Sequence, residues 1–212
     1  MNAAQSKAVR IACKVMRDLK LVPGTRETDA AHWIKKQLKK YGATSAFKII
    51  VGSGERSALP HCFATDKTMK KGELVIVDFG ANVNGFRSDL TRTFILGQPT
   101  AKQKKIYRIV AEAQKAALQA VKAGVSCKAV DLAARGYIEK QGYGKYFIHT
   151  TGHGIRTRVH QGPKISRRNN HRLKAGQVVT IEPGIYIKGF GGVRIEDMVE
   201  VTKTGYKLLT KV

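Results

Sequence analysis

The chain has 212 residues, 42% of them hydrophobic, and a formal net charge of +24 at pH 7. This length suits one sizeable core, and the hydrophobic share excludes an intrinsically disordered chain. No apolar run approaches the ~20 residues of a membrane span, and the first residues lack the apolar stretch of a secretory signal, which predicts a cytoplasmic location without membrane contact. Three cysteines without paired spacing predict neither a disulfide framework nor a cysteine-based zinc site.

Two helices are expected at the start of the chain. The first runs from about residue 4 to residue 19, and Thr25 is the expected N-cap of the second, which Gly42 should end. Alternating apolar residues predict the strands that follow. These strands are expected within residues 46–54, 73–80 and 86–96.

The same order of two helices followed by strands is expected again in the second part of the chain. Thr100 is the expected cap of a helix to about Lys122, and Ser126 is the expected cap of another that ends near Gly142. The apolar segments after them predict strands. These strands are expected within residues 176–184, 193–201 and 206–211.

The letters of the two halves also match. MKKGELVIVDFG (residues 69–80) aligns without a gap with LKAGQVVTIEPG (residues 173–184), so Asp78 corresponds to Glu182. FRSD matches VRIE once the second copy is allowed a longer turn, and Asp89 then corresponds to Glu196. The sequence therefore predicts an internal duplication of helix-helix-strand repeats, about residues 1–98 and 99–212, related by a pseudo-twofold.

Each copy places two carboxylates in strands that are otherwise apolar. A tight turn around residues 83–85 would bring Asp78 and Asp89 to one face, directly opposite or one pair apart. A three-residue loop near Gly189 would align Glu182 with Glu196 in the same way. An ionised carboxylate costs several kcal/mol to bury unless a positive partner meets it. Four of them in one pocket therefore require positive charge.

Two divalent cations would balance the four carboxylates. Oxygen ligands with one imidazole suit manganese, cobalt, zinc or iron, and His153, which lies between two glycines, is the candidate imidazole. Simple salt bridges are the alternative for each acid taken alone. Asp89 could pair with Arg87 or Arg92, and Glu196 with Arg194. The duplicated positions favour the metal hypothesis.

Seven motifs of this chain resemble one known family. They are SALPH, VDFGA, SDLTRTF, TGHGI, VHQGP, TIEPGIYI and GGVRIED. The chain is similar over nearly all 212 residues to the catalytic domain of the pita-bread metallopeptidases, which include methionine aminopeptidases, Xaa-Pro aminopeptidases and Xaa-Pro dipeptidases (prolidases). The C-terminal motifs are more like the proline-directed branch. The resemblance implies an α+β pita-bread fold, with a pseudo-twofold antiparallel sheet covered by helices, in a single catalytic domain at residues 1–212.

The resemblance also implies the ligand set. Asp78 would chelate one metal, Asp89 and Glu196 would bridge both, and His153 and Glu182 would complete the other metal. The cofactors expected are two divalent ions, manganese first and cobalt, zinc or iron as alternatives.

The same resemblance assigns roles in the reaction. A hydroxide that bridges the metals would attack the carbonyl of the first peptide bond of a peptide, proline-containing by preference, and Glu182 would shuttle a proton to the leaving nitrogen. His61 and His160 would contact the substrate and assist catalysis. Arg194 would support ligands or substrate, and an equal alternative is a structural partner of acids.

Some residues depart from the family pattern. Arg156 replaces a glycine, Arg158 an acid and Gln161 a glutamate. Lys164 stands where prolidases often have an arginine that receives the carboxylate of a dipeptide, and lysine does not reproduce that bidentate contact. Preference for dipeptides over longer peptides is therefore left open.

Two other functions remain as alternatives. Residues 140–181 contain no acidic residue, so a non-catalytic pita-bread protein could bind nucleic acid through this basic face, and an enzyme could bind polyanions non-specifically. A methionine aminopeptidase-like enzyme or another small-substrate hydrolase could use the same scaffold. The full ligand set favours the aminopeptidase, and the sequence does not predict an oligomeric state.

Overall fold

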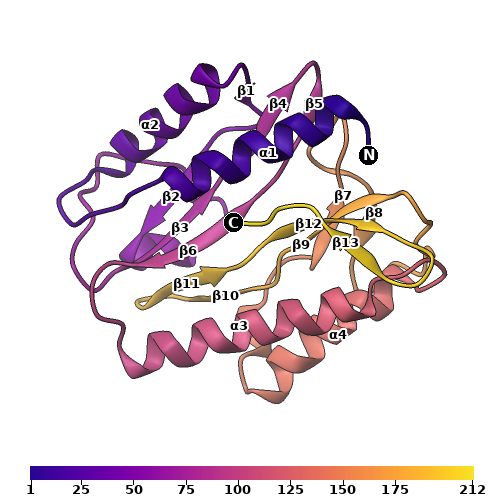
Figure 1. Cartoon of the computed structure of the whole chain (residues 1–212). Helices are drawn as coiled ribbons and strands as arrows, with labels where there is room; N and C mark the ends of the chain where they lie inside the picture. The colour runs from indigo at the N-terminus through magenta and orange to yellow at the C-terminus, as the bar shows by residue number, and fades with distance from the viewer.

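A computed structural model describes all 212 residues. Figure 1 shows two pairs of helices on opposite sides of the strands. The first half contains α1 (Ala3–Asp18), α2 (Glu27–Lys40), β1 (Thr44–Ser45), β2 (Ile50–Ser53), the 3-10 helix η1 (Gly54–Ala58), β3 (Leu74–Asp78), β4 (Ala81–Val83), β5 (Phe86–Arg87) and β6 (Thr91–Ile95). The second half contains α3 (Ala101–Ala120), α4 (Cys127–Lys140), η2 (Gly144–Tyr146), β7 (Gly152–Gly154), β8 (Gln161–Ile165), β9 (Val178–Ile181), β10 (Gly184–Ile187), β11 (Gly191–Arg194), β12 (Asp197–Val201) and β13 (Tyr206–Leu208).

All strand pairs are antiparallel. The strand orders are β2-β3-β6 and β1-β4-β5 in the first half, and β13-β12-β9-β7-β8 and β10-β11 in the second. Helices therefore cover antiparallel strands, and the predicted α+β architecture is confirmed.

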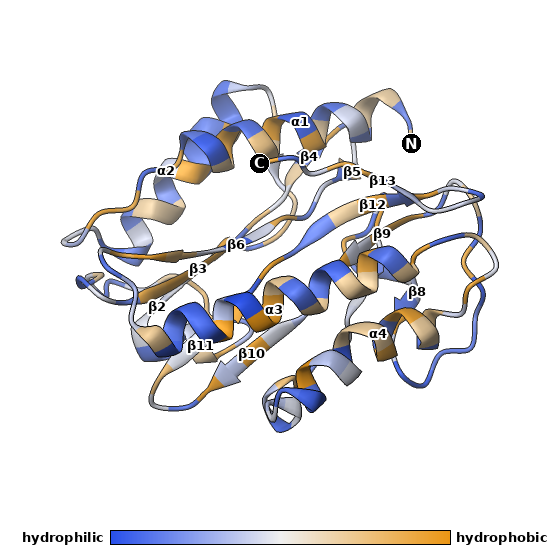
Figure 2. Ribbon diagram, turned by 60° about the horizontal axis from the view of Figure 1, so that its bottom comes forward, coloured by the Kyte–Doolittle hydropathy of each residue, from blue (hydrophilic) through white to orange (hydrophobic).

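Each helix pair packs over its own hydrophobic cluster. The first cluster joins α1 and α2 to the strands of the first half, with Phe79 and Leu90 among its fully buried side chains. The second joins α3 and α4 to the strands of the second half, around Ile138 and Ile181. Figure 2 shows hydrophobic and hydrophilic residues along the same helices, as amphipathic surface helices require. The strands thus lie between two helical layers.

Three of the helix starts test the predicted caps. Thr100 and Ser126 each accept a hydrogen bond from a backbone N–H of the first turn, so both caps are confirmed. The predicted cap Thr25 is wrong, because α2 begins at Glu27 and has Arg26 at the N-cap without a side-chain bond. Backbone carbonyls of Lys67 and Thr65 instead accept the first N–H groups of α2. A long-range backbone contact thus replaces the local cap.

The two halves touch through backbone as well as side chains. The N–H of Gly192 in β11 donates to Oγ of Ser57 in η1 at 2.8 Å. A Cβ atom at Gly192 would lie only 2.2 Å from the carbonyl oxygen of Ser57, so glycine is required here for the close approach. This contact fixes η1, and the pocket segment that follows it, against the second half.

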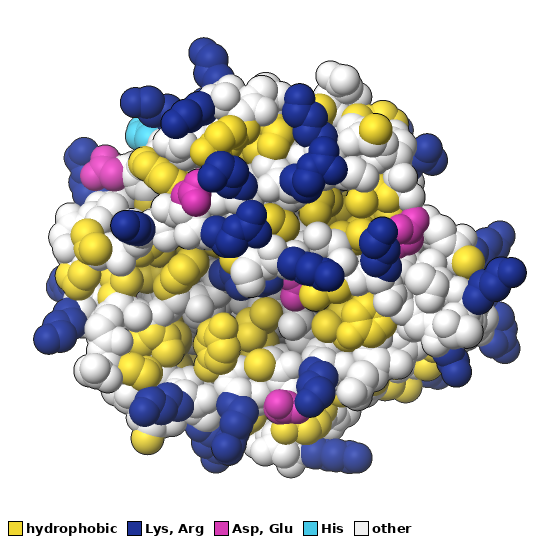
Figure 3. All heavy atoms as spheres, in the orientation of Figure 1, with side chains coloured by type: hydrophobic (Ala, Val, Ile, Leu, Met, Phe, Trp, Pro, Cys, Tyr) yellow, Lys and Arg dark blue, Asp and Glu magenta, His cyan; other side chains and the backbone are white.

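The surface is strongly basic. Figure 3 shows Lys and Arg side chains spread over one whole face, with few Asp and Glu between them. One reason is that several of the acids are inside the protein. The buried acids are Glu27, Asp78, Asp89, Asp131, Glu196 and Asp197. The exterior therefore has a smaller share of acidic residues than the sequence as a whole, whose net charge is +24. None of the helices combines the length and the apolar character that crossing a bilayer requires.

Glu27, at the start of α2, holds the segment that follows β2. It is 0% exposed. Its carboxylate accepts hydrogen bonds from the N–H and hydroxyl groups of Ser53 and Thr65, at 2.8 to 3.1 Å. Arg56 approaches it at 3.2 Å. Because Ser53 and Thr65 bracket the segment that carries His61, this anchor connects the first core to the pocket.

We expect Glu27→Gln to destabilise the protein by about 1.5–3 kcal/mol, because one acceptor oxygen becomes an amide donor facing N–H and hydroxyl groups. Urea denaturation at pH 7 measures this difference. Glu55→Gln, at an exposed position of the adjacent 3-10 helix, serves as control and should change stability by less than about 0.5 kcal/mol. Equal stability of the two variants would contradict the anchoring role.

Candidate metal centre

The hairpin registers bring the four predicted carboxylates to one place. Asp78 pairs with Thr91 across β3 and β6, so Asp89 lies one pair away, which is one of the two predicted arrangements. The turn between β4 and β5 is at Asn84 and Gly85, both with positive φ. In the second half, Gly184 pairs with Arg194 across β10 and β11, and the same register places Glu182 opposite Glu196.

The acids and the predicted imidazole are buried together. Asp78 is 8% exposed, Asp89 4%, His153 7% and Glu196 1%. Asp89, His153 and Glu196 each offer a ligand atom, and these atoms all lie within 4.8 Å of one another. Glu182 joins the group through its Oε1, which lies 3.1 Å from Nε2 of His153. Three residues thus form a compact ligand group, with Glu182 and Asp78 at its sides.

Arg194 contacts one side of this group. Its Nη2 donates to Oδ2 of Asp78 at 2.6 Å, and its Nη1 donates to Oη of Tyr186 at 2.8 Å. Thr91 accepts a bond from Nε of Arg194 at 3.2 Å and donates to Oε2 of Glu196 at 2.7 Å. The guanidinium and the Thr91 hydroxyl thus orient one carboxylate from each half.

The salt-bridge alternative is wrong for two of the acids. Arg92 pairs with Asp197 at 2.8 Å, and Arg194 pairs with Asp78 rather than with Glu196. Arg87 donates to the carbonyl of Ala46. Asp89 and Glu196 therefore have no arginine partner within salt-bridge distance. One oxygen of Glu196, Oε1, and one of Asp78, Oδ1, are buried without any hydrogen-bond partner.

His153 is oriented by its own backbone. Its Nδ1 lies 3.1 Å from the carbonyl oxygen of Gly154, so Nδ1–H donates there and Nε2 faces the carboxylates. Nε2 is 3.1 Å from Glu182 and 3.8 Å from Asp89. Burial opposes a charged imidazole, but these acids raise the pKa of His153 to about 9. A proton on Nε2 thus occupies the position where a cation would meet the same oxygens.

The carboxylates respond to burial in different ways. Burial, and then the neighbouring Asp78, raise the pKa of Asp89 well above its usual range. Burial and the neighbouring Asp89 do the same for Glu196. Burial also acts on Glu182, but the hydrogen bond and charge of His153 lower its pKa to about 2. Burial and mutual repulsion thus oppose the ionisation of Asp89 and Glu196 as long as no further positive charge meets them.

The site opens into a cavity of about 650 Å³. All the predicted site residues line it: Asp78, Asp89, His153, Glu182, Glu196, His61, His160 and Arg194. His61 and His160 are exposed at the opening, and the rings of His153 and His160 lie 4.5 Å apart, edge to face. Burial and the neighbouring His153 lower the pKa of His160. Both histidines can therefore reach a molecule in the cavity.

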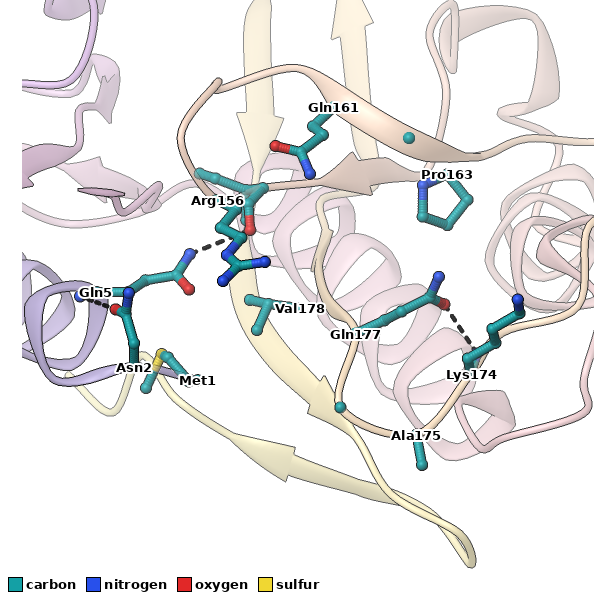
Figure 4. Close-up of a pocket in the computed structure, with 13 residues that line it drawn as sticks. Met1, Asn2, Gln5, Arg156, Gln161, Pro163, Lys174, Ala175, Gln177 and Val178 are labelled. Atoms are coloured by element: carbon teal, nitrogen blue, oxygen red, sulfur yellow. Dashed lines mark hydrogen bonds between the residues drawn. The ribbon is translucent and has the colours of Figure 1, made fainter. Parts of the chain in front are cut away.

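A second cavity of about 620 Å³ lies next to the first and shares Gln161 and Gly162 with it. Figure 4 shows Arg156 and Gln177 at its edge, and Gln5 bonded through its side chain to the backbone carbonyl of Ile155. The lining residues include no aspartate, glutamate, histidine or cysteine. This cavity therefore lacks the carboxylate, imidazole and thiol groups that commonly bind metals.

Sequence reasoning missed two residues of the first site. His149 lines the cavity, and its Nε2 lies 2.8 Å from Oη of Tyr186, the hydroxyl that accepts from Arg194. Burial lowers the pKa of His149 to about 4 and raises that of Tyr186 to about 12, so both are neutral at pH 7. The spacing of His149 and His153 and the Tyr186 of TIEPGIYI were signals available in the sequence.

Comparisons with known proteins agree with this geometry. The profile of metallopeptidase family M24 matches residues 3–203. The Xaa-Pro dipeptidase of Pyrococcus furiosus is 49% identical over 208 residues, which are 97% of this chain and 60% of that protein. The solved prolidase of Pyrococcus furiosus superposes with a TM-score of 0.97 at 47% identity, covering 99% of this chain and 63% of that one.

An X-Pro aminopeptidase of Thermotoga maritima has a TM-score of 0.96 and 40% identity, covering 99% of this chain and 60% of the other. The chain thus spans about 60% of the length of the curated relatives that it matches.

The residues fit the divalent metal that a metallopeptidase implies. The unpartnered oxygens of Asp78 and Glu196 are buried, which costs free energy unless another group meets them. Carboxylate oxygens and one imidazole are suitable ligands for several divalent ions. The negative charge of four acids, countered by Arg194 and His153 alone, would be balanced by bound cations.

We expect Mn²⁺ at about 100 times its Kd to raise the Tm of chelator-treated protein by about 5–10 °C, because binding to the folded state alone adds about 2.7 kcal/mol. Asp89→Ala should remove this shift, since it deletes one of the three clustered ligands. Differential scanning calorimetry with and without Mn²⁺ measures it. Glu112→Ala, on the exposed face of α3, should keep the full shift. An unchanged shift in Asp89→Ala would exclude this site.

Proposed function

Because this chain belongs to metallopeptidase family M24, we propose that it hydrolyses the N-terminal peptide bond of short peptides as a dinuclear-metal exopeptidase. The observation that carries the proposal is the convergence of acids from both halves on one buried group, with two oxygens left unpartnered. A cavity large enough for a short peptide opens directly onto this group.

In the proposed centre, Asp78, Asp89, His153, Glu182 and Glu196 hold two divalent ions. Manganese is the first choice, with cobalt, zinc or iron as alternatives, because the set is four carboxylates and one imidazole without a thiol. When bound, the two ions supply positive charge that polarises the scissile carbonyl and lowers the pKa of water. The backbone bond from Nδ1 of His153 keeps Nε2 available as a ligand.

The protein groups then position the substrate and move protons. Glu182, whose Oε1 lies 3.1 Å from Nε2 of His153 beside the clustered ligands, would accept a proton as a carboxylate and pass it to the leaving nitrogen. His160 has a lowered pKa and is neutral at pH 7, and it donates a hydrogen bond to the carbonyl oxygen as charge develops. His61 contacts the peptide beside the scissile bond. Arg194 keeps Asp78 in place rather than binding substrate directly, in agreement with their 2.6 Å contact.

The substrate preference proposed is Xaa-Pro. It is supported by similarity to an Xaa-Pro dipeptidase at 49% identity and to an X-Pro aminopeptidase at 40%. One of these relatives is named a dipeptidase and the other an aminopeptidase, so cleavage of both dipeptides and longer peptides is to be tested. A cytoplasmic location stays a prediction from the sequence.

We further propose that residues 1–212 are one catalytic domain built from two repeats, about 1–98 and 99–212. Each half has two helices followed by strands and a hairpin. The acids occupy corresponding strand ends. Asp78 is the last residue of β3 and Glu182 follows β9, while Asp89 precedes β6 and Glu196 precedes β12. Such a pattern follows from duplication of one unit.

The non-catalytic alternative, a nucleic-acid-binding protein, has one observation in its favour. The exposed basic residues of residues 140–181 have no salt-bridge partner. A protein that used only this face would have no need of a buried cluster of acids, which costs folding free energy. The intact cluster therefore favours the enzyme.

Metal-loaded protein should release the first residue from peptides of two to five residues with proline second, and should cleave the matched alanine-second peptides more slowly. Mass spectrometry of timed samples identifies the products. Asp89→Ala should lower the rate by more than about 100-fold, because loss of a ligand exceeds the cost of losing an outer partner of a metal site.

Glu112→Ala is the matched control and should retain the wild-type rate. Full activity of Asp89→Ala, or activity that survives complete chelation, would contradict the dinuclear mechanism.

A further inference from the structure

The opening of the catalytic cavity carries two cations that the proposed reaction does not use. Lys48 and Lys164 both line the cavity, and both are exposed. Neither has a carboxylate within salt-bridge distance. The third cation of the lining, Arg194, is already paired with Asp78. All four acids of the lining belong to the buried group.

Lys48 comes from the first half, between β1 and β2. Ile50 pairs with Asp78 across β2 and β3, so its side chain lies on the same side of the sheet as that carboxylate. Lys48 precedes Ile50 by two positions, and both residues line the cavity. Nζ of Lys48 lies 4.2 Å from the ring centre of Phe63, another residue of the cavity wall. The ring thus holds the ammonium group at the wall.

Lys164 comes from the second half, in β8. It pairs directly with His153 of β7, so the two side chains lie on the same side of the sheet. The next residue, Ile165, points the other way and is buried in the second hydrophobic cluster. Lys164 therefore faces the cavity, and its positive charge acts on His160, whose pKa it helps to lower. Each half of the chain thus contributes one unpaired lysine to the same opening.

We propose that Lys48, together with Lys164, selects peptides that carry an acidic side chain beyond the scissile bond. This inference rests on the proposed function, in which the first residue binds at the buried acids and the rest of the peptide extends towards the opening. There it meets two ammonium groups and no surface carboxylate. An exposed ion pair changes affinity by up to about fivefold, so the two lysines together favour an acidic third residue by about 5- to 25-fold over a basic one.

The test uses Ala-Pro-Glu, Ala-Pro-Gln and Ala-Pro-Lys, all as C-terminal amides so that only the third side chain differs in charge. For the metal-loaded protein, kcat/KM should fall in the order Glu, Gln, Lys, with the difference in KM rather than kcat. Lys48→Gln should weaken this order because Lys164 remains, and Lys48→Glu, which leaves one ammonium group beside one carboxylate, should abolish it. A role of Lys48 in packing alone would change all three peptides equally.

Lys36→Glu, on the exposed side of α2, is the matched control because it changes the net charge by the same amount. It should preserve the wild-type order. If it shifts the order as much as Lys48→Glu does, net charge alone explains the preference and the proposal is overturned.

Calorimetric binding of the product analogues Pro-Glu-amide and Pro-Lys-amide separates this inference from the proposed function. Tighter binding of Pro-Glu-amide, weakened in Lys48→Gln, supports the role of Lys48 whether or not peptides are cleaved. Equal affinities overturn it. Failure to cleave any of the three peptides would count against the proposed function alone.

Discussion

The structure depends on one electrostatic constraint, the burial of like charges. Two strand ends from each half direct carboxylates into a common space, and acids at such distances repel one another strongly in a medium of low polarity. Arg194 and His153 offset part of this repulsion, and burial together with the repulsion that remains raises the pKa values of Asp89 and Glu196. Two neighbours help to keep these groups in place: the Thr91 hydroxyl donates to Glu196, and the Tyr186 hydroxyl accepts from Arg194.

Outside the site, two other buried acids have hydrogen-bond and ionic partners for their charges. Glu27 and Asp131 are both 0% exposed and both lie in the second helix of their half. Glu27 bonds to Ser53 and Thr65, and Asp131 pairs with Arg135 at 2.8 Å while accepting from Thr151. Each acid thereby fixes a segment that leads into the cavity, the one with His61 or the one with His153. Buried acids with a full set of partners hold the segments around the cavity in place. Buried acids that lack some of their partners form the candidate metal centre.

Much of this architecture could be predicted from the sequence because it is encoded locally. Apolar alternation predicted β2, β3, β6, β9, β12 and β13 but not β7 and β8, and Thr100 and Ser126 gave two helix starts through their own hydroxyl groups. The repeat aligned the acids in pairs before any contact was known. Thr25 failed as a cap because carbonyls some forty residues away, at Thr65 and Lys67, satisfy the helix instead. The sequence could not predict the ion pair between Arg194 and Asp78 either, because the spacing of these residues is equally compatible with a pair between Arg194 and Glu196.

The contact between Ser57 and Gly192 also restricts which sequences this fold can accept. The two halves meet there through main-chain atoms, at a distance that excludes even one methyl group. Any residue larger than glycine at position 192 would push η1 away from β11. Because His61 follows η1 in the chain, the wall of the cavity would move with it. A single methyl group outside the cluster of acids would thereby change the shape of the site.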